Sequence, residues 1–503
     1  MNPTPDVPIT VTTLLTHVHP DLDAVFSVYL LRQHGEKHFP GVKDAQLQFV
    51  SANELPDGKT ADQLEKEGTL AVDTGGGRLD THPVEGQKNV DKWDVCASEL
   101  VAKAVEVDDH PRYRYLLPYT NAHDARGQAM TSRQAVHHLL APHGLIEGVH
   151  QLAESDEDVV ELISMMLHGL AIAGENEPDP PNETAARFDR TLSYVLQTGT
   201  FESDFIERKS PNEWPERGQS HEIASQMGWT ARRDMEKMLS FASQLIASGD
   251  QALPEAEVER RILLTAALDG LAKEYGEESE TYQSVALKLF TAIIQREADW
   301  FNAIDEIERS AKVHRGRGVS MASIASKNGL TIKAARYRRG VQAVLYYHPE
   351  THAVTLQAGM RKDGSPLLNL ERVAKRLRGA EIIRRKDNGA KLPKDLGRVG
   401  IFQGWFLHPS KRLLNRGSAK APDVEPSALS WQEIIELVRT DLRPDDKMPD
   451  WFCPDDHCLE DKCTMFPLRF LNCKLHKERT ASTPKAGTLG DLFADKLKQA
   501  KRK

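Results

Sequence analysis

Short apolar runs alternate with segments of helical spacing over the first 150 residues. The runs Val11–Leu15, Leu47–Val50 and Leu70–Val72 are continuous and apolar, which is typical of strands buried in a parallel sheet. Helical periodicity covers four further segments: Asp23–Arg32, Ala61–Glu67, Cys96–Val105 and Ser132–Leu140. We therefore expect residues 9–150 to form an α/β domain built on a parallel sheet.

The pattern changes twice further along the chain. Residues 151–310 are almost entirely helical in spacing, so we expect a helical region there. Val341–Tyr347 and Ala353–Gln357 then have strand patterns around a polar turn and predict a hairpin. An amphipathic helix over Leu367–Leu377 follows it. These elements predict a smaller α+β domain over residues 311–440.

The composition is that of a soluble globular protein. Hydrophobic residues make up 40% of the chain and charged residues 28%. No stretch approaches the roughly 20 apolar residues that a membrane-spanning helix needs. The first residues, Met1–Pro5, are polar and lack the features of a signal peptide. We expect a cytoplasmic protein with no membrane partner.

Charge is distributed unevenly along the sequence. The net charge is −9, yet the segment Arg309–Lys420 holds 25 Lys or Arg residues against 6 Asp or Glu residues. Such a basic block favours a polyanionic partner, because neutralising phosphates releases condensed counterions. The alternative is a solvated surface rich in arginine.

The strongest chemical signal follows the first predicted strand, where Thr16–Ala24 reads THVHPDLDA. Ligands of open α/β sheets bind beyond the carboxyl ends of strands. Asp21 and Asp23 can direct their carboxylates at different cations, and His17 adds a nitrogen. Mg²⁺ or Mn²⁺ suits such an oxygen-rich set. The alternative is that Asp21 or Asp23 caps the helix that begins at Asp23.

A second carboxylate signal follows the third predicted strand. Asp73 precedes three glycines, and Asp80, Thr81 and His82 come soon after them. A carboxylate at this strand end can bridge two cations that the first loop holds. The glycines give a tight turn, but the Lys-Ser or Lys-Thr that a phosphate-binding loop would need is absent.

These residues together resemble the DHH phosphoesterase superfamily. The superfamily includes RecJ-type single-strand exonucleases, short-oligoribonucleotide hydrolases, cyclic-dinucleotide phosphodiesterases and family II inorganic pyrophosphatases. Its first motif, His-x-x-Pro-Asp-x-Asp-Ala in one common form, is similar to the segment His17–Ala24. The stretch Asp91–Val107 resembles the helix that follows the third motif of the family.

The resemblance implies a metal ligand set. It places His17 and Asp21 on one divalent cation, Asp23 on the other, and Asp73 between both. Asp124 is the best match for the aspartate of the fourth motif. Mn²⁺ or Mg²⁺ would be the cofactor, and the reaction would be hydrolysis of a phosphodiester by a water that two cations activate.

The resemblance also names residues that would act on the substrate. His82 matches the histidine that contacts the scissile phosphate, and Arg126 is a candidate phosphate contact. The motif that names the family departs here, because Thr81 stands where an imidazole ligand is expected. Either His82 enters the metal shell, or His123 supplies the nitrogen, or the second cation binds weakly.

The basic block loosely resembles the smaller substrate-binding domain of the superfamily. The glycine-rich histidine loop of that domain would fall at a predicted turn over Arg378–Glu381, but it is not present. Arg361, Arg376 and Arg378 are the candidate substrate contacts that replace it. Nearby aromatic side chains could stack on bases or could belong to the core: Tyr346, Tyr347, Phe402, Trp405 and Phe406.

Four cysteines predict a small metal module over residues 441–480. They lie within 21 residues of one another, which is enough to enclose one structural cation: Cys453, Cys458, Cys463 and Cys473. We expect zinc, with an iron–sulfur cluster as the alternative. Reduced buried thiols are the reading without a metal. Residues 481–503 read as a flexible basic tail.

The leading hypothesis is therefore a metal-dependent phosphodiesterase that acts on single-stranded nucleic acid or short oligonucleotides, such as an exonuclease. A phosphodiesterase of a nucleotide second messenger is an alternative. A nucleic-acid-binding protein whose catalytic domain has decayed is the third reading, and Thr81 is the feature that keeps it open.

Overall fold

The computed structural model describes most of the chain up to residue 442. The described residues are 9–51, 54–81, 95–125, 140–177, 179–198, 261–316, 318–359, 367–385, 396–397, 400–402, 404–408 and 410–442. Within them, no helix is long and apolar enough to cross a membrane.

The N-terminal part is built on a three-stranded parallel sheet in the order β2-β1-β3. The strands are β1 (Thr13–His17), β2 (Gln46–Val50) and β3 (Thr69–Ala71). The predicted parallel sheet is confirmed, but β1 begins and ends two residues later than we expected. His17 is consequently the last residue of the central strand, and its side chain is buried.

Helices surround this sheet. They are α1 (Leu22–His34), α2 (Ala61–Lys66), α3 (Ala97–Ala104) and α4 (Leu116–Asp124), with 3₁₀ turns η1 (Gly35–Lys37), η2 (Val42–Asp44), η3 (Pro56–Gly58) and η4 (Pro111–Tyr113). The first three confirm predicted helices. The helix expected over Ser132–Leu140 lies largely outside the described residues.

The middle of the chain is helical, as predicted. Its described helices are α6 (Pro142–Leu152), α7 (Asp156–Glu175), α8 (Pro181–Thr198), α13 (Leu264–Tyr275) and α14 (Glu280–Ser310). One hydrophobic core runs from Val11 in the sheet region to Ile293 in α14. The sheet and these helices therefore share a core, which continues across the boundary that we expected at residue 150.

The C-terminal part holds a seven-stranded mixed sheet in the order β4-β5-β6-β7-β10-β9-β8. Its strands are β4 (Lys312–Gly316), β5 (Val319–Ala325), β6 (Ala343–Tyr347), β7 (Val354–Ala358), β8 (Gly400–Phe402), β9 (Trp405–Leu407) and β10 (Leu413–Arg416). Only β5 and β6 pair in parallel, and α15 (Thr331–Arg339) connects them. The predicted hairpin is confirmed as β6 and β7.

Two further helices, α16 (Glu371–Arg384) and α17 (Trp431–Asp441), cover this sheet. The turn that we predicted over Arg378–Glu381 is wrong, because these residues lie inside α16. Trp405 and Tyr346 are buried in the core, so neither ring is available to stack on a base.

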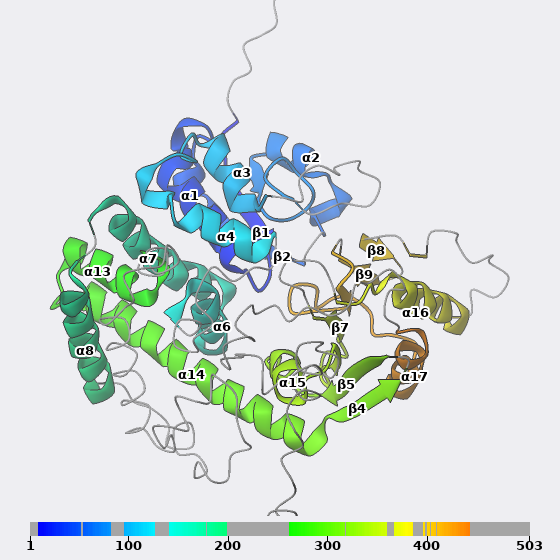
Figure 1. Cartoon of the computed structure of the whole chain (residues 1–503). Coiled ribbons are helices and arrows are strands. Elements are labelled where there is room, and N and C mark those ends of the chain that lie inside the picture. The colour runs from blue at the N-terminus through cyan, green and yellow to red at the C-terminus, as the bar shows by residue number, and fades with distance from the viewer. Residues whose placement is uncertain are drawn as a thin grey trace, which may run out of the picture.

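The long helix α14 joins the two parts (Figure 1), and the β10–α17 loop contacts the N-terminal part. Two residues of this loop make these contacts. The Ser51 hydroxyl donates a hydrogen bond to Asp423, and Lys420 forms an ion pair with Asp21. The carboxyl ends of the parallel strands therefore face the C-terminal sheet domain.

Candidate metal centre

Three predicted metal ligands meet at the carboxyl edge of the parallel sheet. His17 ends β1, Asp21 lies in the loop that follows, and Asp73 comes two residues after β3. One ligand atom from each side chain lies within 4.8 Å of the other two. His17 Nε2 is 3.3 Å from Asp73 Oδ2 and 4.0 Å from Asp21 Oδ1. We call His17, Asp21 and Asp73 the first cluster.

A hydrogen bond orients the His17 imidazole. Its Nδ1 lies 2.9 Å from the carbonyl oxygen of Val18. A carbonyl only accepts, so Nδ1 carries the hydrogen and the lone pair of Nε2 points toward the two carboxylates. Histidines that bind metals are usually held in this way, with the other ring nitrogen donating to a carbonyl or a carboxylate.

The glycine turn after β3 positions Asp73. Gly75 and Gly76 adopt φ angles of 75° and 70°, and the Gly76 amide donates to Asp80 at 2.6 Å. Asp73 itself has a φ of 51°, a conformation that costs a residue with a side chain about 1–3 kcal/mol. Such strain is concentrated at functional sites, and here it holds a buried carboxylate beside His17.

Asp23 takes a different place from the one the resemblance implies. Its two carboxylate oxygens accept hydrogen bonds from the first amides of α3, Ala97 at 2.6 Å and Ser98 at 2.8 Å. Burial, and then the charge of Asp21, raise its pKa. Asp23 therefore caps α3, while Asp21 Oδ1 caps α1 through the amides of Asp23 and Ala24. The capping alternative holds for Asp21 and, at another helix, for Asp23.

Asp124 lies at the end of α4 and faces the same acidic group. Its removal from water by the surrounding protein, and then the charges of Asp23, Asp21 and Asp73, raise its pKa well above the usual range. A further cation here would be attracted by all four carboxylates. The ring of His123 stacks on His143 with 4.4 Å between the centroids.

Lys420 is the site residue that sequence reasoning missed. Its ammonium group donates to Asp21 Oδ2 and lies 3.4 Å from His17 Nε2. Burial opposes its charge, but Asp21 and Asp73 outweigh burial and raise the pKa of Lys420. A positive charge from the other sheet domain thus occupies the centre of the first cluster. The only sequence signal was its place at the end of the basic block.

Two other predicted residues, Arg376 and Arg378, are described by the structure and have partners away from this centre. Arg378 does not fit a substrate contact, because it is fully buried and donates to the carbonyls of Leu396, Gly400 and Trp405. Arg376 is exposed and pairs with Asp441 on α17. The remaining candidates lie outside the described residues: His82, Arg126, Arg361, Cys453, Cys458, Cys463 and Cys473.

A pocket of about 660 Å³ opens beside the first cluster, between the N-terminal part and helices α14 and α15. His19, Asp21 and Lys420 line one side of it. The other side carries several charged groups: Glu147, Arg296, Asp299, Glu306, Arg309, Lys327 and Lys333. Arg296 and Lys333 both pair with Glu147 across the two parts.

Two more arginines belong to the C-terminal sheet domain, one on α15 and one directly before β10. Burial, and then the charge of Arg412, lower the pKa of Arg336 to about 10, and burial also lowers the pKa of Arg412. Arg412 and Lys333 both act electrostatically on His123, which in turn senses Asp21. In the described part of the chain, neither guanidinium donates to a carboxylate. Two partly buried cations that repel each other are a suitable place for an anion.

Comparisons with known proteins leave the chain unassigned: it matches no family model, and no curated protein is significantly similar to it.

Proposed function

We propose that this protein is a metal-dependent phosphodiesterase that acts on single-stranded nucleic acid or short oligonucleotides. The observation that carries the proposal is the first cluster, which sits at the carboxyl edge of a parallel sheet and opens toward a pocket lined by both basic and acidic side chains. Ligand sites of open α/β sheets occur at this edge.

The residues of the first cluster suit Mn²⁺ or Mg²⁺. One neutral imidazole nitrogen and two carboxylates form a mixed, oxygen-rich set, and His17 presents its lone pair to it. Bound divalent cations lower the pKa of a coordinated water and clamp phosphate oxygens. The Asp73 amide donates to the Leu79 carbonyl across the glycine turn, and Asp21 Oδ1 caps α1, so hydrogen bonds already hold both residues in place.

The substrate side of the proposal depends on the C-terminal sheet domain. Arg336 and Arg412 repel each other and have no carboxylate to neutralise them in the described residues. A phosphate between them would relieve the repulsion and form charge-assisted hydrogen bonds. Lys333 lies on the pocket wall, where it pairs with Glu147. These three groups would hold the phosphate backbone beside the first cluster.

The test is a metal-dependent cleavage assay with a panel of phosphoesters. The full chain with Mn²⁺ is given end-labelled single-stranded DNA, single-stranded RNA, a dinucleotide, a cyclic dinucleotide and pyrophosphate. We expect release from at least one nucleic-acid substrate. Asp73→Asn should lower the rate at least about 100-fold, since even second-shell changes at metal sites cost 10–100-fold. Asp62→Asn, an exposed carboxylate on α2, is the matched control.

One observation favours a second candidate, a binding protein without catalysis. The ammonium group of Lys420 already neutralises Asp21 and contacts His17, and Thr81 removes an expected imidazole. For such a binding protein, we expect single-stranded DNA or RNA to bind and no substrate to be cleaved with any metal. Turnover of the cyclic dinucleotide alone would instead support the second-messenger phosphodiesterase, for which a pocket of about 660 Å³ is large enough.

A further inference from the structure

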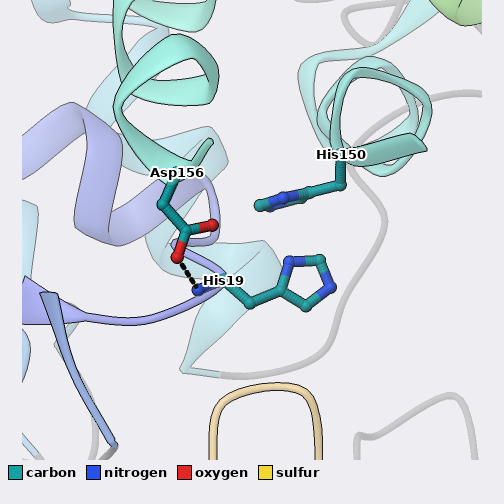
Figure 2. Close-up of side chains that lie close together, drawn as sticks. All are labelled: His19, His150 and Asp156. Atoms are coloured by element: carbon teal, nitrogen blue, oxygen red, sulfur yellow. Dashed lines mark hydrogen bonds between the residues drawn. The ribbon is translucent and has the colours of Figure 1, made fainter. Parts of the chain in front are cut away.

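A second group of potential ligands lies on the pocket side of the loop that follows β1. It consists of His19 from this loop, His150 from the last turn of α6 and Asp156, the first residue of α7 (Figure 2). One ligand atom from each lies within 4.8 Å of the other two. None of these residues belongs to the first cluster, and the resemblance assigns none of them a role.

Hydrogen bonds hold two of these side chains in place and leave one ligand atom of each available. Asp156 Oδ2 accepts from the His19 amide at 2.8 Å, which leaves Oδ1 directed toward the two imidazoles (Figure 2). His150 Nε2 lies 2.8 Å from the Pro20 carbonyl, so Nε2 carries the hydrogen and Nδ1 keeps its lone pair. A backbone carbonyl behind a histidine is the usual second shell of a metal ligand.

The two imidazoles also approach each other unusually closely. Their centroids are 3.7 Å apart with the planes at 87°, whereas aromatic pairs usually keep about 4.5–7 Å. His19 reaches this position with a φ of 53°, which is strained for a residue with a side chain.

We propose that His19, His150 and Asp156 bind one divalent cation, at a site separate from the first cluster. Two imidazole nitrogens and one carboxylate oxygen favour Zn²⁺ or Mn²⁺ over Mg²⁺ and Ca²⁺, which prefer oxygen. At metal–ligand distances of about 2.0–2.2 Å two ligand atoms lie at most about 4.4 Å apart, so atoms separated by up to 4.8 Å must move closer together on binding.

This cation would face the pocket. His19 and His150 both line it, and three protein ligands leave a coordination position for a water or an anionic group. The site therefore offers a positive charge on the pocket wall. The inference stands whether or not the first cluster hydrolyses phosphodiesters, because it rests on a different set of residues.

The experiment measures how many Mn²⁺ and Zn²⁺ ions the chelator-treated full chain binds, by calorimetry and by metal analysis after dialysis. Asp156→Asn keeps an acceptor for the His19 amide and removes the charged ligand, and His150→Gln removes an imidazole. Both variants should bind one equivalent of metal fewer than wild type, or bind it with at least about tenfold lower affinity. His168 is a partly buried histidine on α7 outside this group. His168→Gln is the matched control and should bind metal as wild type does.

Two further measurements separate this site from the others. Asp73→Asn should keep the equivalent that Asp156→Asn loses, because the two variants affect different clusters. Crystals soaked in Zn²⁺ should give an anomalous peak between His19 and His150, which does not depend on how well any variant folds. Wild-type stoichiometry in both His150→Gln and Asp156→Asn, or no peak at that position, would overturn the proposal.

Discussion

The Lys420 ammonium group and a divalent metal ion would compete for the same atoms of the first cluster. Its ammonium group uses Asp21 Oδ2 and approaches His17 Nε2, and both atoms are needed by a metal ion. A divalent cation must therefore displace the ammonium group or accept it as a close positive neighbour. Either arrangement costs metal affinity, because like charges in a partly buried site repel.

Replacing this lysine tests the competition. Lys420→Met should bind Mn²⁺ about 10–100 times more tightly than wild type, since hydrogen bonds to charged groups are worth about 1.5–3 kcal/mol. Isothermal titration calorimetry measures the change. Lys411→Met, which breaks an ion pair with Glu371 instead, should leave the affinity unchanged. A weaker affinity in Lys420→Met would mean that the lysine supports the bound metal.

Individual residues of this centre differed in how well the sequence predicted them. His17, Asp21 and Asp73 were accessible because each follows a strand, and parallel strands end at one edge. Asp23 was ambiguous because the amides that it caps belong to a helix 74 residues away. Lys420 was beyond sequence reasoning, since it reaches His17 across 403 residues and through the packing of two sheets.

At the scale of elements, α16 is anchored by a buried carboxylate. Glu381 is fully buried and accepts from the Ala428 amide, the Ser427 hydroxyl and Arg385, with Arg416 nearby. Burial opposes its charge, but these hydrogen bonds and Arg416 outweigh burial and lower its pKa below the ordinary 4.5. The helix, the β10 strand and the loop before α17 therefore meet at one charge.

Glu381→Gln should destabilise the protein by about 3–5 kcal/mol at pH 7, because it leaves buried arginine without its counter-charge. A carboxyl group whose pKa is lower in the folded than in the unfolded protein stabilises the fold at pH values above the unfolded-state pKa. This stabilisation is lost as the pH falls through the folded-state pKa. The difference from wild type should thus be full at pH 7 and shrink below about pH 4.5. Urea unfolding at several pH values measures it; a difference that grows on acidification contradicts this account.

Predictability also varied among the elements. The parallel strands and the β6–β7 hairpin were recognisable because continuous apolar runs and a polar turn mark them locally. The strands β8, β9 and β10 are three or four residues long, too short for a period to be read. The Arg378–Glu381 segment was misread because its glycine suggested a turn, whereas packing against Trp405 keeps it helical.

On the scale of the whole molecule, part of the positive charge of the basic block is balanced by nearby carboxylates. Many of its cations pair with carboxylates of the same sheet domain or of α14, for example Lys327 with Glu350, Arg339 with Glu308 and Arg384 with Glu433. The excess of positive charge counted along the sequence is therefore much larger than the charge that faces the pocket.

Binding of single strands should consequently depend only moderately on salt. If about five cations meet phosphates, log K should fall with log salt at a slope of about −3 to −4, whereas neutralisation by the whole excess would give about −13. Fluorescence anisotropy with a labelled oligonucleotide over a range of KCl concentrations measures the slope. A slope near the larger value would place the polyanion along the outside of the domain.

The helix α14 is both a structural support and a wall of the pocket. Its 31 residues extend for about 46 Å, so a small tilt at one end becomes a large displacement at the other. Near its middle, Gly148 of α6 packs so closely that an added methyl group would lie 2.2 Å from the Ala292 carbonyl oxygen. A methyl group at this position would push α6 and α14 apart and would change the shape of a pocket that it does not contact.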